Sequence, residues 1–241
     1  MKRKPLRILL WTLVAGLLAA GGALAETSGV LEHPDWDQID RYIESQMADC
    51  RIPGFSLGIV RDGELLYMKG YGRADDTGRA VTPQTPFLIG SVSKSITAMA
   101  VMQLVEAGRI GLDDPVQTYL PGFALADERA SGAITVRMLL NHTSGIPEQA
   151  EFQVATLRGD DETMGELIAK FKAIRPIGQP GARFAYGNAN YIILGALIEQ
   201  VSGMTYDAYI RQYIFEPLEM RHSYASAVDA AKDGLATGYR P

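Results

Sequence analysis

The stretch Gly90-Ser91-Val92-Ser93-Lys94-Ser95 opens a strongly apolar segment that we expect to be helical from about Ser91 to Ala107, with Gly108 ending it. Ser91 and Lys94 are three residues apart, so a helix projects both side chains from one face of its first turn. A serine hydroxyl becomes nucleophilic when a neighbouring base takes its proton, and a lysine can be that base if its pKa is lowered. Backbone N–H groups at the helix start can also stabilise an oxyanion. The motif predicts an acyl-accepting Ser91; the alternative is an N-cap serine with a solvated lysine one turn later.

A second polar segment, Tyr186-Gly187-Asn188, precedes an apolar segment that we expect to be helical from Ala189 to Ser202. A phenol held near a lysine ammonium can lose its proton and act as a general base, and an asparagine amide can orient a substrate carbonyl. The alternative interpretation is a loop whose asparagine caps the following helix.

These two segments, with Leu139-Leu-Asn-His-Thr-Ser-Gly-Ile-Pro147 between them, resemble the serine beta-lactamase, D,D-peptidase and esterase superfamily, in particular the class C beta-lactamases. The resemblance runs from about Asp37 to the C-terminus. It implies a mixed α/β (α+β) fold of the beta-lactamase/transpeptidase type, in which helices and a helical region flank an antiparallel sheet.

The resemblance also implies a role for each matched residue. Ser91 would form the acyl-enzyme, and its backbone N–H would supply half of the oxyanion hole. Lys94 would pass protons to and from it, and Tyr186 would be the second base or acid. Asn188 would contact the substrate amide or the lysine. We interpret His142 as structural, because a neutral histidine that caps a turn is commoner there than a catalytic one.

One element of the superfamily is missing after Tyr186. Relatives have a Lys-Thr-Gly or His-x-Gly triplet on an inner strand, which binds the substrate carboxylate, whereas Ala236-Thr237-Gly238 lacks the leading cation. We therefore expect residues 26–241 to be a C-terminally incomplete domain that lacks the closing strands of its sheet.

The remaining chain predicts a short hairpin and several helices. Phe55–Val60 and Leu65–Tyr71 are apolar strands on either side of Asp62-Gly63, a dipeptide typical of tight hairpin turns. Helical patterns cover residues 34–50, 135–140, 162–171 and 206–214, with Thr135 as the cap of the second.

The first 25 residues have the pattern of a secretory signal. Four basic residues at positions 2, 3, 4 and 7 precede an apolar run, and Ala23-Leu24-Ala25 supplies small residues before Glu26. We expect cleavage there and a periplasmic or extracellular protein; the alternative is an uncleaved segment that anchors it to the membrane. The mature chain would then have 19 Lys and Arg against 28 Asp and Glu, a formal net charge of −9.

Composition excludes several other classes of function. The acidic balance and the lack of a basic stripe argue against nucleic-acid binding. Cys50 is the one cysteine, so no internal disulfide forms, and we expect a buried or idle thiol at a helix end. No His, Asp or Glu cluster has metal-ligand spacing, so we expect neither a metal nor another cofactor.

The resulting prediction is an exported serine hydrolase that forms an acyl-enzyme on Ser91. Its substrate would be a small molecule or a peptidoglycan peptide, with beta-lactams, D-Ala-D-Ala peptides and small esters left open, as is the oligomeric state. Two alternatives stay open: a penicillin-binding or sensor module with little turnover, and an inactive fragment of such an enzyme.

Overall fold

The computed structural model describes residues 35–151 and 164–239. The predicted signal segment lies outside these ranges, as does the start of the helix predicted over 162–171. Within them, no helix has the length and apolar character needed to cross a membrane. The described chain forms two compact units that divide after Ile52.

The first unit contains helix α2 (Trp36–Cys50). Asp35 begins it by accepting a hydrogen bond from the backbone N–H of Gln38 at 3.0 Å, and Arg51 ends it in the left-handed conformation with φ 54°. The predicted N-terminal helix is thus confirmed. Cys50 is exposed at its end, so the buried interpretation of this thiol is wrong.

The second unit starts with the predicted hairpin, formed by strands β1 (Gly54–Arg61) and β2 (Glu64–Gly72). Asp62 and Gly63 both have positive φ, 54° and 83°, as a two-residue turn that matches the twist of its strands requires. The strands pair antiparallel, with an irregularity between Ile59 and Val60. Among the described residues they make up a two-stranded sheet.

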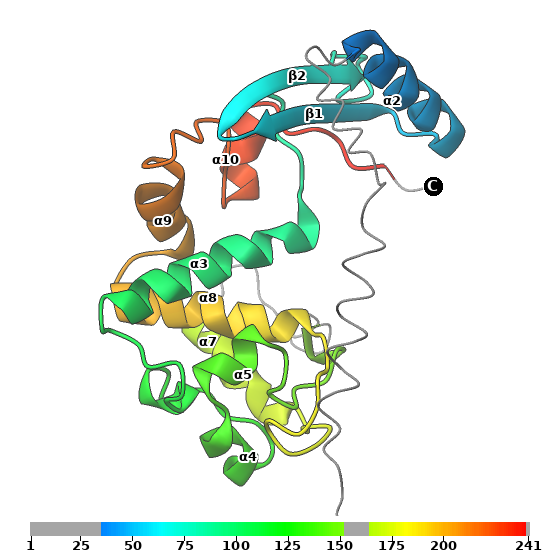
Figure 1. Ribbon diagram of the computed structural model, residues 1–241. Helices are drawn as coiled ribbons and strands as arrows, with labels where there is room; N and C mark the ends of the chain where they lie inside the picture. The colour runs from blue at the N-terminus through cyan, green and yellow to red at the C-terminus, as the bar shows by residue number, and fades with distance from the viewer. Residues whose placement is uncertain (1–34, 152–163, 240–241) are drawn as a thin grey trace, which may run out of the picture. The chain divides into compact units, whose positions relative to one another are not determined.

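Helices α3 (Ser93–Glu106) and α8 (Asn188–Ser202) form the centre of the helical region and lie side by side, with both N-termini toward the same side of the view (Figure 1). The inner helix α8 is apolar on nearly all of its faces, and Ile193, Leu194 and Leu197 have no exposed surface. Burying such a side chain contributes about 1.5–3 kcal/mol. The core therefore forms around α8, which also packs against α5, α7 and α9.

Shorter elements surround this pair. They are the 3-10 turns η1 (Gly90–Val92), η2 (Val116–Thr118) and η3 (Lys170–Ala173), the helices α4 (Glu128–Ala133), α5 (Val136–Leu140), α7 (Met164–Ala169), α9 (Tyr206–Ile210) and α10 (Ala227–Lys232), and the π-turn η4 (Arg211–Phe215). Thr135 caps α5 as predicted, by accepting from the Met138 N–H at 3.3 Å.

Two helical predictions need correction, and two short helices were missed. The α-helix after the Gly90 motif begins at Ser93, two residues later than predicted, because Gly90–Val92 form a 3-10 turn. The helix predicted over 206–214 changes to a π-turn at Arg211. Helices α4 and α10 were not predicted; each has only six residues and depends on a side-chain cap, from Asp127 and Ser226 respectively.

Candidate active site

Ser91 lies in turn η1, at the junction between the connection from the hairpin and helix α3. Gly90 before it has a φ of 53°, a conformation that a side chain would strain, and it turns the chain into the helix. Thr97, Val101 and Leu104 fix α3 through its buried face, while Ser91 stays exposed. The N–H groups of Val92 and Ser93 that follow the serine donate to the carbonyls of Ile89 and Gly90, which closes the turn.

Lys94 is held between the two predicted segments. Its Nζ donates to Ser91 Oγ at 3.1 Å and to Asn188 Oδ1 at 2.5 Å. The ammonium also lies over the rings of Tyr186 and Tyr191, with its nitrogen 4.8 and 5.6 Å from their centroids. The interpretation of Lys94 as a solvated lysine is therefore wrong. So is that of Ser91 as an N-cap, because neither η1 nor α3 has a side-chain cap bond.

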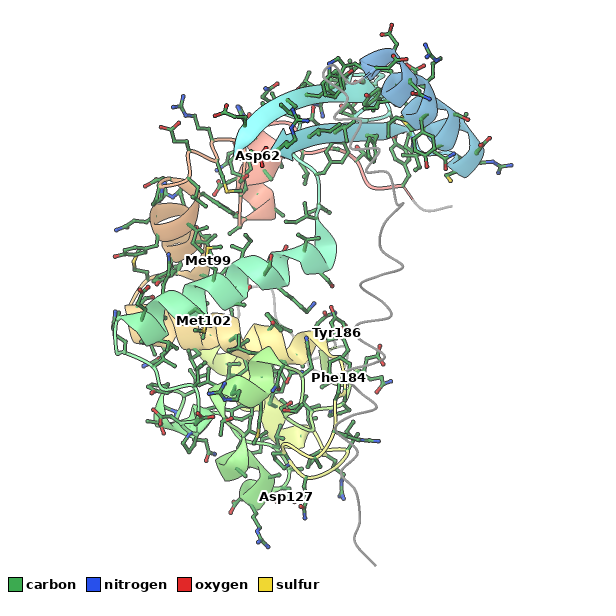
Figure 2. All side chains as sticks on the ribbon, in the orientation of Figure 1. Asp62, Met99, Met102, Asp127, Phe184 and Tyr186 are labelled. Carbon is green, nitrogen blue, oxygen red and sulfur yellow. The ribbon has the colours of Figure 1, made fainter. Side chains whose placement is uncertain are left out.

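Tyr186 supplies the third group around the serine. Its hydroxyl donates to Ser91 Oγ at 2.8 Å from the segment just before α8, where Figure 2 labels it. Hydrogen bonding to Lys94, and then to Ser91, lowers the pKa of Tyr186 below its ordinary value. The phenol is thus easier to deprotonate than a free tyrosine, and it touches the oxygen whose proton must be removed.

Asn188 is the first residue of α8, and Gly187 occupies the N-cap position. The Asn188 side chain forms no cap bond and instead joins Lys94 to Glu151, whose Oε1 accepts from Asn188 Nδ2 at 2.8 Å. The interpretation of Asn188 as a helix cap is therefore wrong. Ser91, Lys94, Tyr186 and Asn188 thus form one connected hydrogen-bonded group.

The ring of His142 packs against the ring of Tyr186. It is buried with φ 59°, and its ring lies 4.5 Å from that of Tyr186 and 5.2 Å from that of Tyr191. Its Nδ1 accepts from the Gly187 N–H at 3.3 Å, so the ring proton belongs on Nε2. Burial, with a smaller contribution from Lys94, lowers the pKa of His142 and favours the neutral ring. These contacts are those of a residue that positions the Tyr186 segment.

A buried polar network continues from His142 into the core. Asn190 Oδ1 accepts from Ser144 Oγ at 2.5 Å, and Asn190 Nδ2 donates to the Gly187 carbonyl at 3.2 Å. The same nitrogen lies 3.3 Å from His142 Nδ1. Buried polar groups without partners are costly, so this network fixes the loop that contains Tyr186 relative to the segment around Ser144.

Sequence reasoning missed Glu151. It follows the Leu139–Pro147 segment closely, but its spacing from Lys94 or Asn188 in sequence gives no signal of contact. Among the described residues, no group of three His, Cys, Asp or Glu side chains is arranged to hold a metal ion. The side chains that are assembled here favour proton transfer at a nucleophilic serine.

Comparison with known proteins agrees with this chemistry. The beta-lactamase family model matches residues 39–241. Penicillin-binding protein 4 of Amycolatopsis lactamdurans is 34% identical over 212 residues, which cover 86% of this chain and 53% of that protein. The chain spans about half the length of the curated relatives it matches.

Two solved structures are similar as well. The octameric penicillin-binding protein homologue from Pyrococcus abyssi has a TM-score of 0.73 and 38% identity, over 86% of this chain and 48% of that one. EstCE1, a hydrolase with promiscuous acyltransferase activity, has a TM-score of 0.71 and 29% identity, over 84% and 56%. The predicted fold, helices with an antiparallel sheet of the beta-lactamase/transpeptidase type, is therefore confirmed. The chain belongs to the beta-lactamase family, within the superfamily of serine beta-lactamases, penicillin-binding proteins and related esterases.

Proposed function

We propose that this protein is an exported serine hydrolase that forms an acyl-enzyme on Ser91. The observation that supports this most directly is that Ser91 Oγ receives hydrogen bonds from both Lys94 Nζ and Tyr186 Oη, at 3.1 and 2.8 Å. A serine with two proton-handling groups in contact is equipped for covalent catalysis, and a serine that only binds a ligand has no need of both. The family relationship supports the same class of reaction.

The reaction would proceed in two halves. In the first, Tyr186 as phenolate takes the proton of Ser91 as Oγ bonds to the substrate carbonyl carbon, while Lys94 compensates the developing charge. Collapse of the tetrahedral adduct breaks the acyl C–N or C–O bond, and the leaving group takes up the proton. In the second half, water gives a proton to the same base and attacks the acyl carbon. The bond from that carbon to Ser91 Oγ then breaks, Oγ takes the proton back from the base, and the acid is released.

The proposed substrates are compounds whose acyl group can be transferred to the serine: a beta-lactam, a D-Ala-D-Ala peptide or a small ester. Both Ser91 and Tyr186 are exposed, so the described part of the site is open to solvent. Asn188 Nδ2 already donates to Glu151. These contacts support the second of the two roles that we considered for Asn188, which is contact with Lys94.

The test is acylation of the purified full chain by one reagent of each class: a chromogenic cephalosporin, a fluorescent penicillin, a D-Ala-D-Ala peptide and a nitrophenyl ester. We expect a covalent adduct on the Ser91 peptide by mass spectrometry and release of product. Ser91→Ala should abolish both. Ser95→Ala is the matched control, since the exposed Ser95 hydroxyl only donates to the Val92 carbonyl at 2.7 Å.

Other outcomes would favour the alternatives. An adduct that forms on Ser91 and persists for hours would indicate a penicillin-binding or sensor module. The absence of any adduct, with activity equal in the wild type and Ser91→Ala, would contradict the proposal and favour an inactive fragment.

Export is proposed on the N-terminal sequence pattern alone. N-terminal sequencing of the protein recovered from the periplasm or medium should begin at Glu26. Recovery with the membranes and an intact Met1 would instead support the anchor.

A further inference from the structure

Among the residues that the structure describes, one oxygen of the Glu151 carboxylate has a hydrogen-bond partner and the other has none. Its Oε1 accepts from Asn188 Nδ2 at 2.8 Å. Its Oε2 is inaccessible to solvent and has no hydrogen-bond partner among the residues that the structure describes. A buried acceptor without a partner lowers the stability of the fold. We therefore ask what the other oxygen, Oε1, contributes in return.

Glu151 determines which end of the Asn188 amide faces Lys94. An amide has an acceptor end and a donor end, and the two can exchange by rotation. An ionised carboxylate only accepts, so it draws the NH₂ group to itself and turns Oδ1 the other way. In that orientation Oδ1 meets Lys94 Nζ at 2.5 Å. A rotated amide would bring two donors together and would break both bonds.

The orientation of the amide in turn positions the ammonium of Lys94. The amide oxygen and Ser91 Oγ each accept from Nζ, and the Tyr186 ring lies beneath it at 4.8 Å. A lysine side chain has several free rotations, and it loses this geometry readily when one acceptor is lost. The hydrogen-bonded chain therefore runs from Glu151 through Asn188 and Lys94 to Ser91.

We propose that Glu151 is a positioning residue, which acts through the Asn188 amide to hold Lys94 against Ser91. This rests on the proposed function, because the benefit of holding Lys94 is acylation at Ser91. Glu151 touches neither the nucleophile nor the base in the hydrogen bonds of the described chain, so its effect passes through the amide.

Tyr186 provides a readout of this arrangement that does not depend on turnover. Hydrogen bonding to Lys94 and then to Ser91 lowers the pKa of Tyr186, whereas the charge of Glu151 raises it slightly. The neighbouring rings of His142 and Tyr191 pack against the same region. Removing only the Glu151 charge should therefore lower the pKa of Tyr186. A variant that also releases Lys94 should have a raised Tyr186 pKa, since it loses the hydrogen bond to Lys94, which is the largest cause of the lowering.

The experiment compares Glu151→Gln with Glu151→Ala. Glutamine keeps an acceptor for Asn188 without the charge, and alanine removes the acceptor. Glu148→Ala is the matched control, because Glu148 is an exposed glutamate three residues earlier in the same segment. Acylation rates are measured with the reagent that labels Ser91. The pKa of Tyr186 is followed by NMR on tyrosine labelled with ¹³C at the phenolic carbon, with Tyr186→Phe identifying its signal.

We expect Glu151→Gln to acylate within about threefold of the wild type, and Glu151→Ala to acylate roughly ten- to a hundredfold more slowly, as expected for loss of a hydrogen bond to a charged group. The pKa of Tyr186 should fall in the glutamine variant and rise in the alanine variant. If Glu151→Ala does not fold, Glu151→Asp, which keeps the charge but is one methylene shorter, should show the same loss.

Three results would overturn the inference: an alanine variant as fast as the wild type, equal losses in the glutamine and alanine variants, or an equal loss in Glu148→Ala. Failure of the proposed function is distinguishable from these. In that case the wild type would form no adduct on Ser91, yet the opposite movements of the Tyr186 pKa would still support the positioning by Glu151.

Discussion

Replacing Tyr186 with phenylalanine removes one hydroxyl and leaves the ring in place. The hydroxyl is 2.8 Å from Ser91 Oγ, while the ring contacts of His142 and Lys94, at 4.5 and 4.8 Å, need no oxygen. Tyr186 is also 39% exposed, so removal of its hydroxyl leaves no cavity. We therefore expect the melting temperature to change by less than about 2 °C.

The effect on acylation should be large, because a well-placed general base contributes roughly 100- to 10,000-fold to a rate. Since the pKa of Tyr186 is lowered, phenolate forms below the pH at which a free tyrosine ionises. In the wild type, kcat/KM for an ester should rise with pH and then reach a plateau. The apparent pKa of this rise should lie below 10, the ordinary value for tyrosine. Tyr186→Phe should acylate more slowly, and its kcat/KM should no longer show this rise with pH.

The assay is a pH series of stopped-flow acylation with an ester, with melting curves measured on the same samples. Tyr213→Phe is the matched control, because Tyr213 is 45% exposed and its ring also stacks, 4.7 Å from that of Tyr209. It should acylate like the wild type. A Tyr186→Phe variant that retains its rate within threefold and keeps the rising limb would refute the assignment of Tyr186 as the base.

Three further predictions concern stability. Phe171→Ala should cost about 3–5 kcal/mol of unfolding free energy in urea titrations, because the ring is fully buried against Phe123; a loss below about 1 kcal/mol would contradict this core. Asn190→Leu should cost about 2 kcal/mol or more in the same measurement, since it removes the acceptor of the buried Ser144 hydroxyl; an unchanged midpoint would show that the network is dispensable. Asp75 has its pKa lowered from 3.8 to about 2 by hydrogen bonds from Thr77 and then Arg79, so its contribution is present above pH 3.8 and disappears as the pH falls toward 2. Asp75→Asn should therefore lower the melting temperature at pH 7, and the gap to the wild type should shrink as the pH falls through about 2. A gap at pH 2 as large as that at pH 7 would point to another cause.

Local patterns were sufficient to predict much of the secondary structure. The hairpin follows from Asp62-Gly63, whose positive φ values few other dipeptides adopt. The start of α5 follows from Thr135, and α8 follows from its continuous apolar run. These signals act over a few residues, so they survive without knowledge of the rest of the chain. Short elements such as the π-turn at Arg211 have no comparable signal, because packing decides them.

The active site also has a part that follows from the sequence and a part that depends on the tertiary structure. The sequence by itself determined that Ser91 and Lys94 lie at one helix start, since three residues of helix bring their side chains to one face. The resemblance implied that Tyr186 and Asn188 join them. Only the tertiary structure decided which atoms meet and that Glu151 takes part. The packing of α8 against α3, together with the His142 support, brings these distant segments together. Contacts between distant segments fix the orientation of the Asn188 amide, and hydrogen bonding to Lys94 and then Ser91 lowers the pKa of Tyr186. Neither property can be read from the spacing of residues along the chain.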